Sequence, residues 1–202
     1  ADPMPYALIL APTGNTQIDQ AITDASQLAR LREEAPVGPF ALIARAESDA
    51  ARFDDVLRSF GYYDASIQIR IAGLATNDPA LLPLLEDLPS APPVAVSVQI
   101  EPGPLYQLGV VRLDGPVPEV ARAAFTLKPG EPARAAEVLS AGAAVLRALR
   151  EDGFALAAVA PPDALVDHHT RTMDVVYLAD PGPRLSLGTV SVHGLNRLRE
   201  DY

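Results

Sequence analysis

Two patterns of apolar and polar residues alternate along the first half of the chain. An apolar run at 6–11 precedes two stripes with helical spacing, over 18–29 and 44–60, and residues 66–71 then alternate strictly. A further apolar segment follows at 94–100. Helical spacing predicts amphipathic helices and strict alternation predicts half-buried strands, so this half should fold in the order β-α-α-β-β.

Proline and glycine predict where these elements end. The cluster of Pro and Gly at 36–39 should end the first helix, and Gly61 stands where a left-handed cap should end the second. A proline-rich, acidic segment at 73–93 is predicted to be an insertion, with a short helix within 78–88. The last strand of this half should follow directly after it.

The second half of the chain repeats the same order of elements. A strand is predicted at 105–113 and a short helix at 117–125, and Pro132 is well placed to open a longer helix. Two more strands are predicted at 155–160 and 172–179. The whole chain is therefore predicted to be α+β, with each three-stranded mixed sheet covered on one face by two helices.

An internal repeat marks the boundaries between these units. Residues 96–115 align without a gap with residues 175–194, at a spacing of 79 residues, and each copy is a strand, a Pro-Gly-Pro hinge and a second strand. The hinge residues are Pro102, Gly103 and Pro104 in the first copy and Pro181, Gly182 and Pro183 in the second. Proline fixes φ, so each hinge should be short and semi-rigid.

The repeat divides the chain into tandem domains. We expect a first domain at 6–103, a second at 104–182 and the first strand of a third, truncated domain at 183–202. Residues 1–5 are predicted to be a leader, and the chain is predicted to be a piece of a longer protein. The strand of the third domain is placed at 185–192.

Composition narrows the classes of function. The formal net charge is −10 with only 16 Lys and Arg, which argues against nucleic acid because phosphate binding needs clustered cations. No apolar run approaches the ~20 residues that cross a bilayer. Cysteine is absent, so neither disulfides nor thiolate metal sites are expected, and this also suits an oxidising space such as the bacterial periplasm.

One cluster of residues permits a catalytic interpretation. Asp167, His168 and His169 lie in a polar stretch between two predicted strands, and an acidic α+β hydrolase could be built around them. A solvated loop is the competing interpretation, because a zinc site needs three or four converging ligands. No phosphate-binding loop, dinucleotide fingerprint or nucleophile elbow accompanies the cluster, so we expect no catalytic residue, metal or cofactor.

The motifs around the predicted second helix resemble those of a known family. Arg45-Ala46 with Asp49, the turn Gly61-Tyr62-Tyr63, and Gly153-Phe154 at the same place in the second half resemble POTRA domains of the Omp85 superfamily. The segment 127–132 adds to the likeness, which is greatest to TamA-like outer-membrane assembly proteins. The resemblance implies a periplasmic, non-enzymatic region that binds other proteins.

The resemblance also implies the partners and the way they bind. An inner-membrane-anchored TamB-like protein, or unfolded outer-membrane or autotransporter client chains, would add a strand to an exposed sheet edge. The edge residues implied are Tyr62, Tyr63, Ile67, Ile69, Phe154, Ala157 and Val159. The two tyrosines have an alternative role in core packing. A BamA-like insertase or a two-partner secretion transporter is the alternative within the superfamily.

Overall fold

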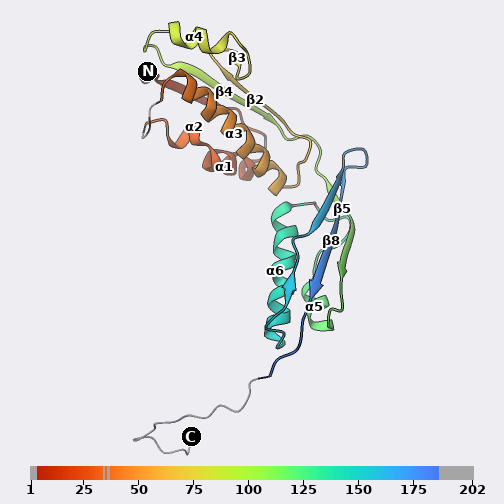
Figure 1. Ribbon diagram of the computed structural model, residues 1–202. Helices are drawn as coiled ribbons and strands as arrows, with labels where there is room; N and C mark the ends of the chain where they lie inside the picture. The colour runs from red at the N-terminus through yellow and green to blue at the C-terminus, as the bar shows by residue number, and fades with distance from the viewer. Residues whose placement is uncertain (1–3, 34, 36, 187–202) are drawn as a thin grey trace, which may run out of the picture.

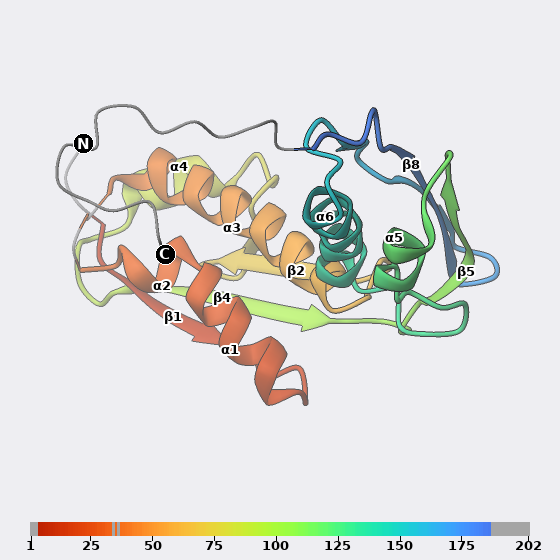
Figure 2. The same ribbon diagram turned by 90° about the horizontal axis from the view of Figure 1, so that it is seen from below.

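The computed structural model describes residues 4–33, 35 and 37–186, which form two α+β modules in tandem (Figures 1 and 2). We call them module 1 (residues 4–101) and module 2 (residues 105–180). The elements of module 1 are β1 (Tyr6–Leu10), α1 (Thr16–Ala25), α2 (Gln27–Arg30), α3 (Pro39–Ser59), β2 (Ser66–Ile71), β3 (Leu74–Ala75), α4 (Leu81–Asp87) and β4 (Val94–Glu101). The elements of module 2 are β5 (Gln107–Asp114), α5 (Glu119–Ala124), α6 (Ala135–Glu151), β6 (Ala158–Val159), β7 (Asp163–Asp167) and β8 (Thr172–Asp180). The predicted α+β class is confirmed.

The sheet of module 1 has the strand order β1-β4-β2-β3. β1 runs parallel to the central strand β4, and β2 runs antiparallel to it. Ala72 and Gly73 both have positive φ and form the tight turn that folds β3 back onto the end of β2. The sequence predicts three strands here, and β3 is an additional, two-residue strand that its short length hid.

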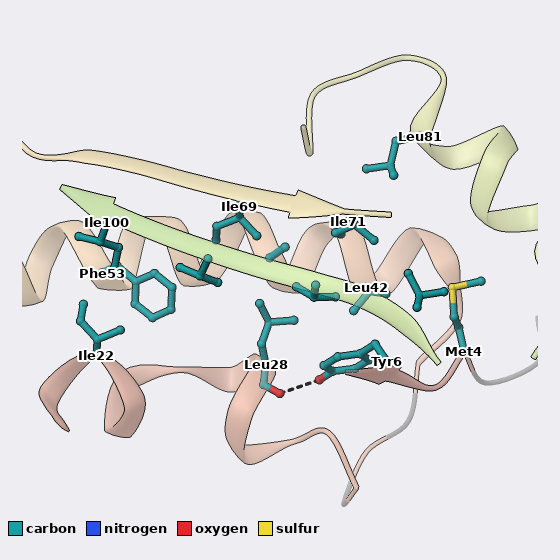
Figure 3. Packing of buried hydrophobic residues seen from close by; sticks show 14 of the residues in the cluster. Met4, Tyr6, Ile22, Leu28, Leu42, Phe53, Ile69, Ile71, Leu81 and Ile100 are labelled. Atoms are coloured by element: carbon teal, nitrogen blue, oxygen red, sulfur yellow. Dashed lines mark hydrogen bonds between the residues drawn. The ribbon is translucent and has the colours of Figure 1, made fainter. Parts of the chain in front are cut away.

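Helices α1, α2 and α3 bury their apolar stripes against one face of this sheet. Phe53 and Leu42 of α3 and Ile71 of β2 are completely buried in this core (Figure 3). Burying side chains of this size contributes about 2 kcal/mol each. Tyr6 of β1 is buried with them, and its hydroxyl donates to the Leu28 carbonyl at 2.8 Å, so no polar group is left unpaired there. This core fixes β2 at the rim of the module.

A buried carboxylate divides the first predicted helix in two. The sequence predicts one helix over 18–29, whereas the chain breaks at Ser26 between α1 and α2. Asp49 of α3 is completely buried and accepts hydrogen bonds from Ser26 Oγ at 2.8 Å and from the N–H groups of Gln27 and Leu28 at 2.9 Å. These are free donors at the start of α2, so Asp49 caps α2 from another helix.

Pro39 begins a helix instead of ending one. The sequence places Pro39 in a break before a helix over 44–60, whereas α3 starts at Pro39 itself. That prediction was wrong because proline fits the first position of a helix, where its missing N–H would have no partner anyway. Arg45, on the second turn of α3, donates to the carbonyls of Leu31 and Ala35 at 3.3 and 3.0 Å and so binds the chain beyond α2.

Segment 73–93 is an integral part of module 1. The helix predicted within 78–88 is confirmed as α4, which packs against α3. Leu81 and Leu85 of α4 are completely buried in the same core as β2 and β4. The segment predicted to be an insertion is therefore packed into module 1, and its removal would expose the end of the core.

The sheet of module 2 is built around β8. β5 runs parallel to β8, and both β6 and β7 run antiparallel to its other side. β5 contains a bulge between Leu108 and Val111, where Asp174 of β8 accepts the Val110 N–H at 2.7 Å. A Cβ on Gly109 would collide with this carboxylate, so a larger residue at the bulge would displace the Asp174 side chain.

Helices α5 and α6 cover one face of this second sheet (Figures 1 and 2). Tyr177 of β8 is completely buried between the layers, and its hydroxyl donates to the Val138 carbonyl of α6 at 2.6 Å. Burial raises the pKa of Tyr177 to about 12. A Cβ on Gly142 would lie 3.4 Å from the Tyr177 ring, so this glycine lets α6 lie close to the sheet.

No helix in the described part of the chain is long and apolar enough to cross a bilayer. Most of the strand predicted at 185–192 lies outside the described residues, which end at Ser186.

Candidate functional site

The outer edge of β2 is covered by β3 only at its end. The Ala72 N–H bonds to the Ala95 carbonyl of β4, so alternate residues of β2, Arg70 among them, direct their backbone groups toward β4. Ile67 and Ile69 therefore direct their N–H and C=O groups away from β4. β3 pairs only with Arg70 and Ile71, so these four groups have no strand partner among the described residues.

A turn keeps this edge open. Beyond β3 the Asp78 N–H bonds to the Ala75 carbonyl at 3.0 Å, and this turn carries the chain away from the sheet. Without the turn, Thr76 and Asn77 would continue along β2 and cover Ile69. A groove results, lined by residues 67–70 on one side and 75–77 on the other. Its geometry fits a short extended segment placed beside β2.

Tyr62 and Tyr63 lie at the seam between the modules. Tyr62 packs against the core of module 1 and forms an isolated β-bridge with Leu105. Tyr63 crosses into module 2, where its hydroxyl donates to the Ala133 carbonyl at 2.8 Å and its ring packs edge-on against Tyr106, with 5.5 Å between centroids. Burial raises the pKa of Tyr63. The core-packing alternative therefore describes both rings better than an exposed edge does.

The first Pro-Gly-Pro hinge is bound to the module before it. Helix α3 ends in a Schellman cap at Gly61, whose φ is +97°, as the sequence predicts. The Gly61 carbonyl then accepts the Tyr106 N–H at 2.9 Å. Gly103 has a φ of +74°, and a Cβ there would lie only 2.5 Å from the Asp64 carbonyl oxygen. Pro102, Gly103 and Pro104 thus form a docked link.

The second hinge repeats this contact. Helix α6 ends in the same cap at Gly153, whose carbonyl accepts the Leu185 N–H at 2.8 Å. Leu185 follows Tyr106 by the 79 residues of the repeat. Arg184 adds hydrogen bonds to the Asp152 carbonyl and carboxylate at 2.9 and 3.0 Å. Pro181, Gly182 and Pro183 therefore lead into a docked strand start, as the first hinge does.

The edge predicted for module 2 differs from the one that the structure has. Phe154 and Ala157 lie outside any strand, and Ala157 is buried in the core of module 2, so the strand predicted at 155–160 is confirmed only at Ala158 and Val159. The start of this segment is a turn, in which the Ala157 N–H bonds to the Phe154 carbonyl at 3.0 Å. Only Val159 belongs to a strand, the two-residue β6, and the principal edge is β7, within a stretch that the sequence interprets as a loop.

The Asp167-His168-His169 cluster forms the tip of the β7–β8 hairpin. Asp167 accepts the N–H groups of His169 and Thr170 at 2.8 and 3.2 Å, and these bonds hold the pKa of its carboxyl below the usual range. His168 Nδ1 bonds instead to the Tyr106 hydroxyl at 2.9 Å. Asp167 orients its own turn and not the imidazole, so a catalytic triad is not assembled. No metal-binding group of His, Cys, Asp or Glu occurs among the described residues.

Two features of the site are missing from the sequence interpretation. One is the contact of Tyr63 with module 2, where the Ala133 carbonyl accepts its hydroxyl from 70 residues away and Tyr106 packs against its ring. The other is β7, whose alternation of Ala164, Leu165 and Val166 is apolar on both faces. Pro161-Pro162, directly before β7, is the available signal, because proline in a sheet is confined to edge strands, strand starts and bulges.

Comparison with known proteins gives structural neighbours of one kind. No protein-family model matches the chain, and no curated protein matches it. The chain aligns with the crystal structure of POTRA domains 3–5 of BamA from Haemophilus influenzae at 20% identity and a TM-score of 0.48, covering 94% of this chain and 73% of that one. POTRA domains 1–3 of the periplasmic domain of Omp85 from Anabaena align at 12% identity and a TM-score of 0.45, covering 89% and 62%.

A third neighbour is the N-terminal domain of Omp85 from Thermosynechococcus elongatus. It aligns at 13% identity and a TM-score of 0.43, over 90% of this chain and 63% of that chain. All three TM-scores are below 0.5.

Proposed function

We propose that this chain is a pair of POTRA domains from the periplasmic part of an Omp85-type outer-membrane assembly protein. Its task is to bind extended segments of client or partner proteins along the edge of β2, in the manner of an added strand. No covalent chemistry takes part, because the work of the site is recognition and placement. The modules act as a scaffold that presents this edge at a set position.

The open edge of β2 is the observation that carries the proposal. Ile67 and Ile69 offer two N–H and two C=O groups in the spacing of a β-ladder, next to a groove that the turn after β3 leaves free. A strand that pairs with them gains up to four backbone hydrogen bonds, each worth about 1 kcal/mol net. Backbone pairing accepts many sequences, which suits a protein that handles different client chains.

The side chains along β2 favour one kind of client segment. Ile67 and Ile69 point toward the helices, whereas Gln68 and Arg70 are exposed on the other face. In an added strand, every second residue would therefore lie beside the isoleucines on the helix side. The residues between them would lie beside Gln68 and Arg70 on the exposed side. Segments that alternate apolar and polar residues, as outer-membrane strands do, fit both layers.

The TamA-like branch is the assignment that we favour within the superfamily. It is supported by Asp49 and Arg45, which the resemblance singles out and which organise the helices of module 1. On this assignment the partner is an inner-membrane-anchored TamB-like protein. A BamA-like insertase or a two-partner secretion transporter would use the same edge, and the number of POTRA domains that the complete gene encodes separates the three.

A third module beginning at 183 is part of the proposal. It is supported by the repeat at a spacing of 79 residues and by the second docked hinge, in which Leu185 binds Gly153 as Tyr106 binds Gly61. The chain would then be one stretch of a longer array in which every link is docked on the preceding helix cap.

The test uses the whole chain and a fluorescent peptide with alternating apolar and polar residues, titrated by fluorescence anisotropy. Ile67→Pro removes an edge N–H that has no partner in the sheet and places a ring at the edge. Ile67→Val keeps the N–H and is the matched control. We expect a loss of affinity of about tenfold for the proline variant, and little change for the valine variant.

Circular dichroism and a thermal melt establish that both variants are folded. A photo-crosslinker at Gln68, whose side chain is exposed, should yield peptide adducts in the wild type and lose them in Ile67→Pro. Equal affinity of the two variants for the peptide, with both folded, would remove the β2 edge from the proposal. Adducts that persist in Ile67→Pro would do the same.

A further inference from the structure

The uncovered face of the module 2 sheet carries a concentration of exposed apolar side chains. Helices α5 and α6 lie on the same side of this sheet in both views, and no described element lies over the other side (Figures 1 and 2). We call this other side the open face of module 2. Leu165 is 70% exposed, Leu178 is 60% exposed and Val110 is 52% exposed.

The strand register places these three side chains on one face. Met173, Val175, Tyr177 and Ala179 of β8 are buried in the core, so the alternate residues of β8, Leu178 among them, point to the open face. Leu165 stands directly opposite Asp174, which also belongs to this face. The bulge in β5 brings the exposed Val110 to the same residue, because its N–H bonds to Asp174.

The open face also carries an excess of negative charge. Asp114, Asp163, Asp174 and Asp180 lie on it or at its end, and Arg112 is the one cation that the described strands place among them. Arg112 is already paired with Asp114 at 2.8 Å. The Asp163 carboxylate makes no hydrogen bond or ion pair with the side chains or backbone of the described residues, so its charge is available to a partner.

Charge identifies the kind of partner that this face accepts. A second copy of the chain would bring another formal charge of −10, and an anionic membrane surface would also be repelled. A partner segment with apolar residues flanked by Lys or Arg matches both the leucines and the carboxylates. The face offers side chains and no free backbone groups in its centre, so the segment must satisfy its own backbone, as a helix does.

We propose that the open face of module 2 docks an amphipathic helix with basic flanks, supplied by a partner protein. This site is separate from the β2 edge. It contacts the side chains of its partner, whereas the β2 edge pairs with the partner's backbone. The helix lies across β8, with its apolar stripe on Leu165, Leu178 and Val110 and its cations beside Asp163. The sheet then has helices on both faces.

The test is a titration of the full chain with two fluorescent helical peptides of about four turns. One carries a Leu stripe flanked by Lys, and the other has Glu in place of every Lys. The double variant Leu165→Asn with Leu178→Asn should lose affinity for the Lys peptide by about tenfold or more. Leu139→Asn is the matched control, because Leu139 is 65% exposed on α6, on the opposite side of the same module.

Three further outcomes complete the test. Asp163→Asn should weaken binding about threefold and reduce its dependence on salt, the Glu peptide should not bind, and Ile67→Pro should leave binding unchanged. Chemical-shift changes in the NMR spectrum should fall on β7 and β8. Equal losses in the Leu139 variant and the double variant, binding of both peptides alike, or no binding of the Lys peptide would each overturn the proposal.

Discussion

Apart from α2 and α4 of module 1, the two modules have the same order of elements, but their sheet edges are built in opposite ways. In module 1 the edge of β2 runs without interruption from Ser66 to Ile69 before β3 covers its end. In module 2 the corresponding edge is divided into β6 and β7 by Pro161 and Pro162, and carboxylates stand at both ends of β7. One edge is continuous and the other is fragmented.

This difference between the two edges indicates where an added strand can bind. Proline has no N–H and cannot extend a ladder, and charged residues at an edge discourage pairing with another chain. Module 2 has both proline and charged residues at its edge. Its exposed apolar side chains lie on the open face of its sheet. Module 1 has neither along residues 66–69, and its sheet face is polar at Gln68 and Gln99. This difference is why we propose strand binding for module 1 and helix docking for module 2.

The largest expected effect comes from Asp49→Ala. The substitution leaves the hydroxyl of Ser26 and the N–H groups of Gln27 and Leu28 without the carboxylate that binds them in the core. We expect a loss of about 3 kcal/mol in the free energy of unfolding of module 1, because several buried donors lose their acceptor together. Urea denaturation followed by circular dichroism measures it.

The matched control is Asp54→Ala on the same helix. Asp54 is paired with Arg58 at 2.7 Å, but both side chains are largely solvated, so the expected loss is about 0.3 kcal/mol. If both variants lose the same stability, the buried carboxylate does not organise module 1. NMR signals of β8 should stay unchanged in both, since module 2 has a core of its own.

The second prediction concerns the seam that joins the modules. Tyr63→Ala removes the hydrogen bond to Ala133 and the edge-on contact with Tyr106, so we expect a loss of about 2 kcal/mol in the free energy of unfolding. Tyr63→Phe keeps the ring and should lose only about 1 kcal/mol. Small-angle scattering should show a wider range of module orientations for Tyr63→Ala, and an unchanged profile would contradict a fixed seam.

Local patterns in the sequence predict most of the fold. Helical stripes, the glycine cap at Gly61 and the alternation of β2 depend on neighbours within a few residues, and the structure confirms all three. The predictions that were wrong concern places where residues distant in sequence are in contact. Asp49 divides a continuous apolar stripe from 21 to 23 residues away, and no local rule reveals that contact.

The candidate site follows the same division. The alternation of Ile67 and Ile69 predicts a strand, but its position at an edge depends on the turn at Ala75 and Asp78 that carries β3 away. The place of Tyr63 depends on Ala133, in the other module. Whether a strand lies at an edge, or a side chain at a seam, depends on segments distant in sequence. The periodicity of a strand therefore does not predict it.

The third prediction concerns the loss of stability of module 2 at alkaline pH. Tyr177 has its pKa raised to about 12 by burial, against an unfolded value near 10, and burial also raises the pKa values of Tyr106 and Tyr63. The unfolded chain therefore loses these protons before the folded chain does. The stabilisation is complete below pH ~10 and is lost as the pH rises toward ~12, by about 1 kcal/mol per unit for Tyr177.

Urea denaturation between neutral and alkaline pH measures this loss, with NMR signals of β8 reporting on module 2. Tyr177→Phe is the control, and the slope above pH ~10 should become shallower in it. A slope that is identical in the wild type and the phenylalanine variant would show that another group causes the alkaline loss.

The smallest expected effect comes from repairing the edge of module 2. Replacing Pro161, Pro162 and Asp163 with Thr restores three residues of high strand propensity, so that β6 and β7 can join into one edge like that of β2. The alternating peptide should then bind to module 2 as well, with a gain of about 1 kcal/mol or roughly fivefold in affinity there. Pro129→Thr, in an exposed turn before α6, is the control and should gain nothing. If the repaired edge binds no peptide while β2 does, then proline and charge are not what distinguishes the two modules, and the groove beside β2 must supply the difference.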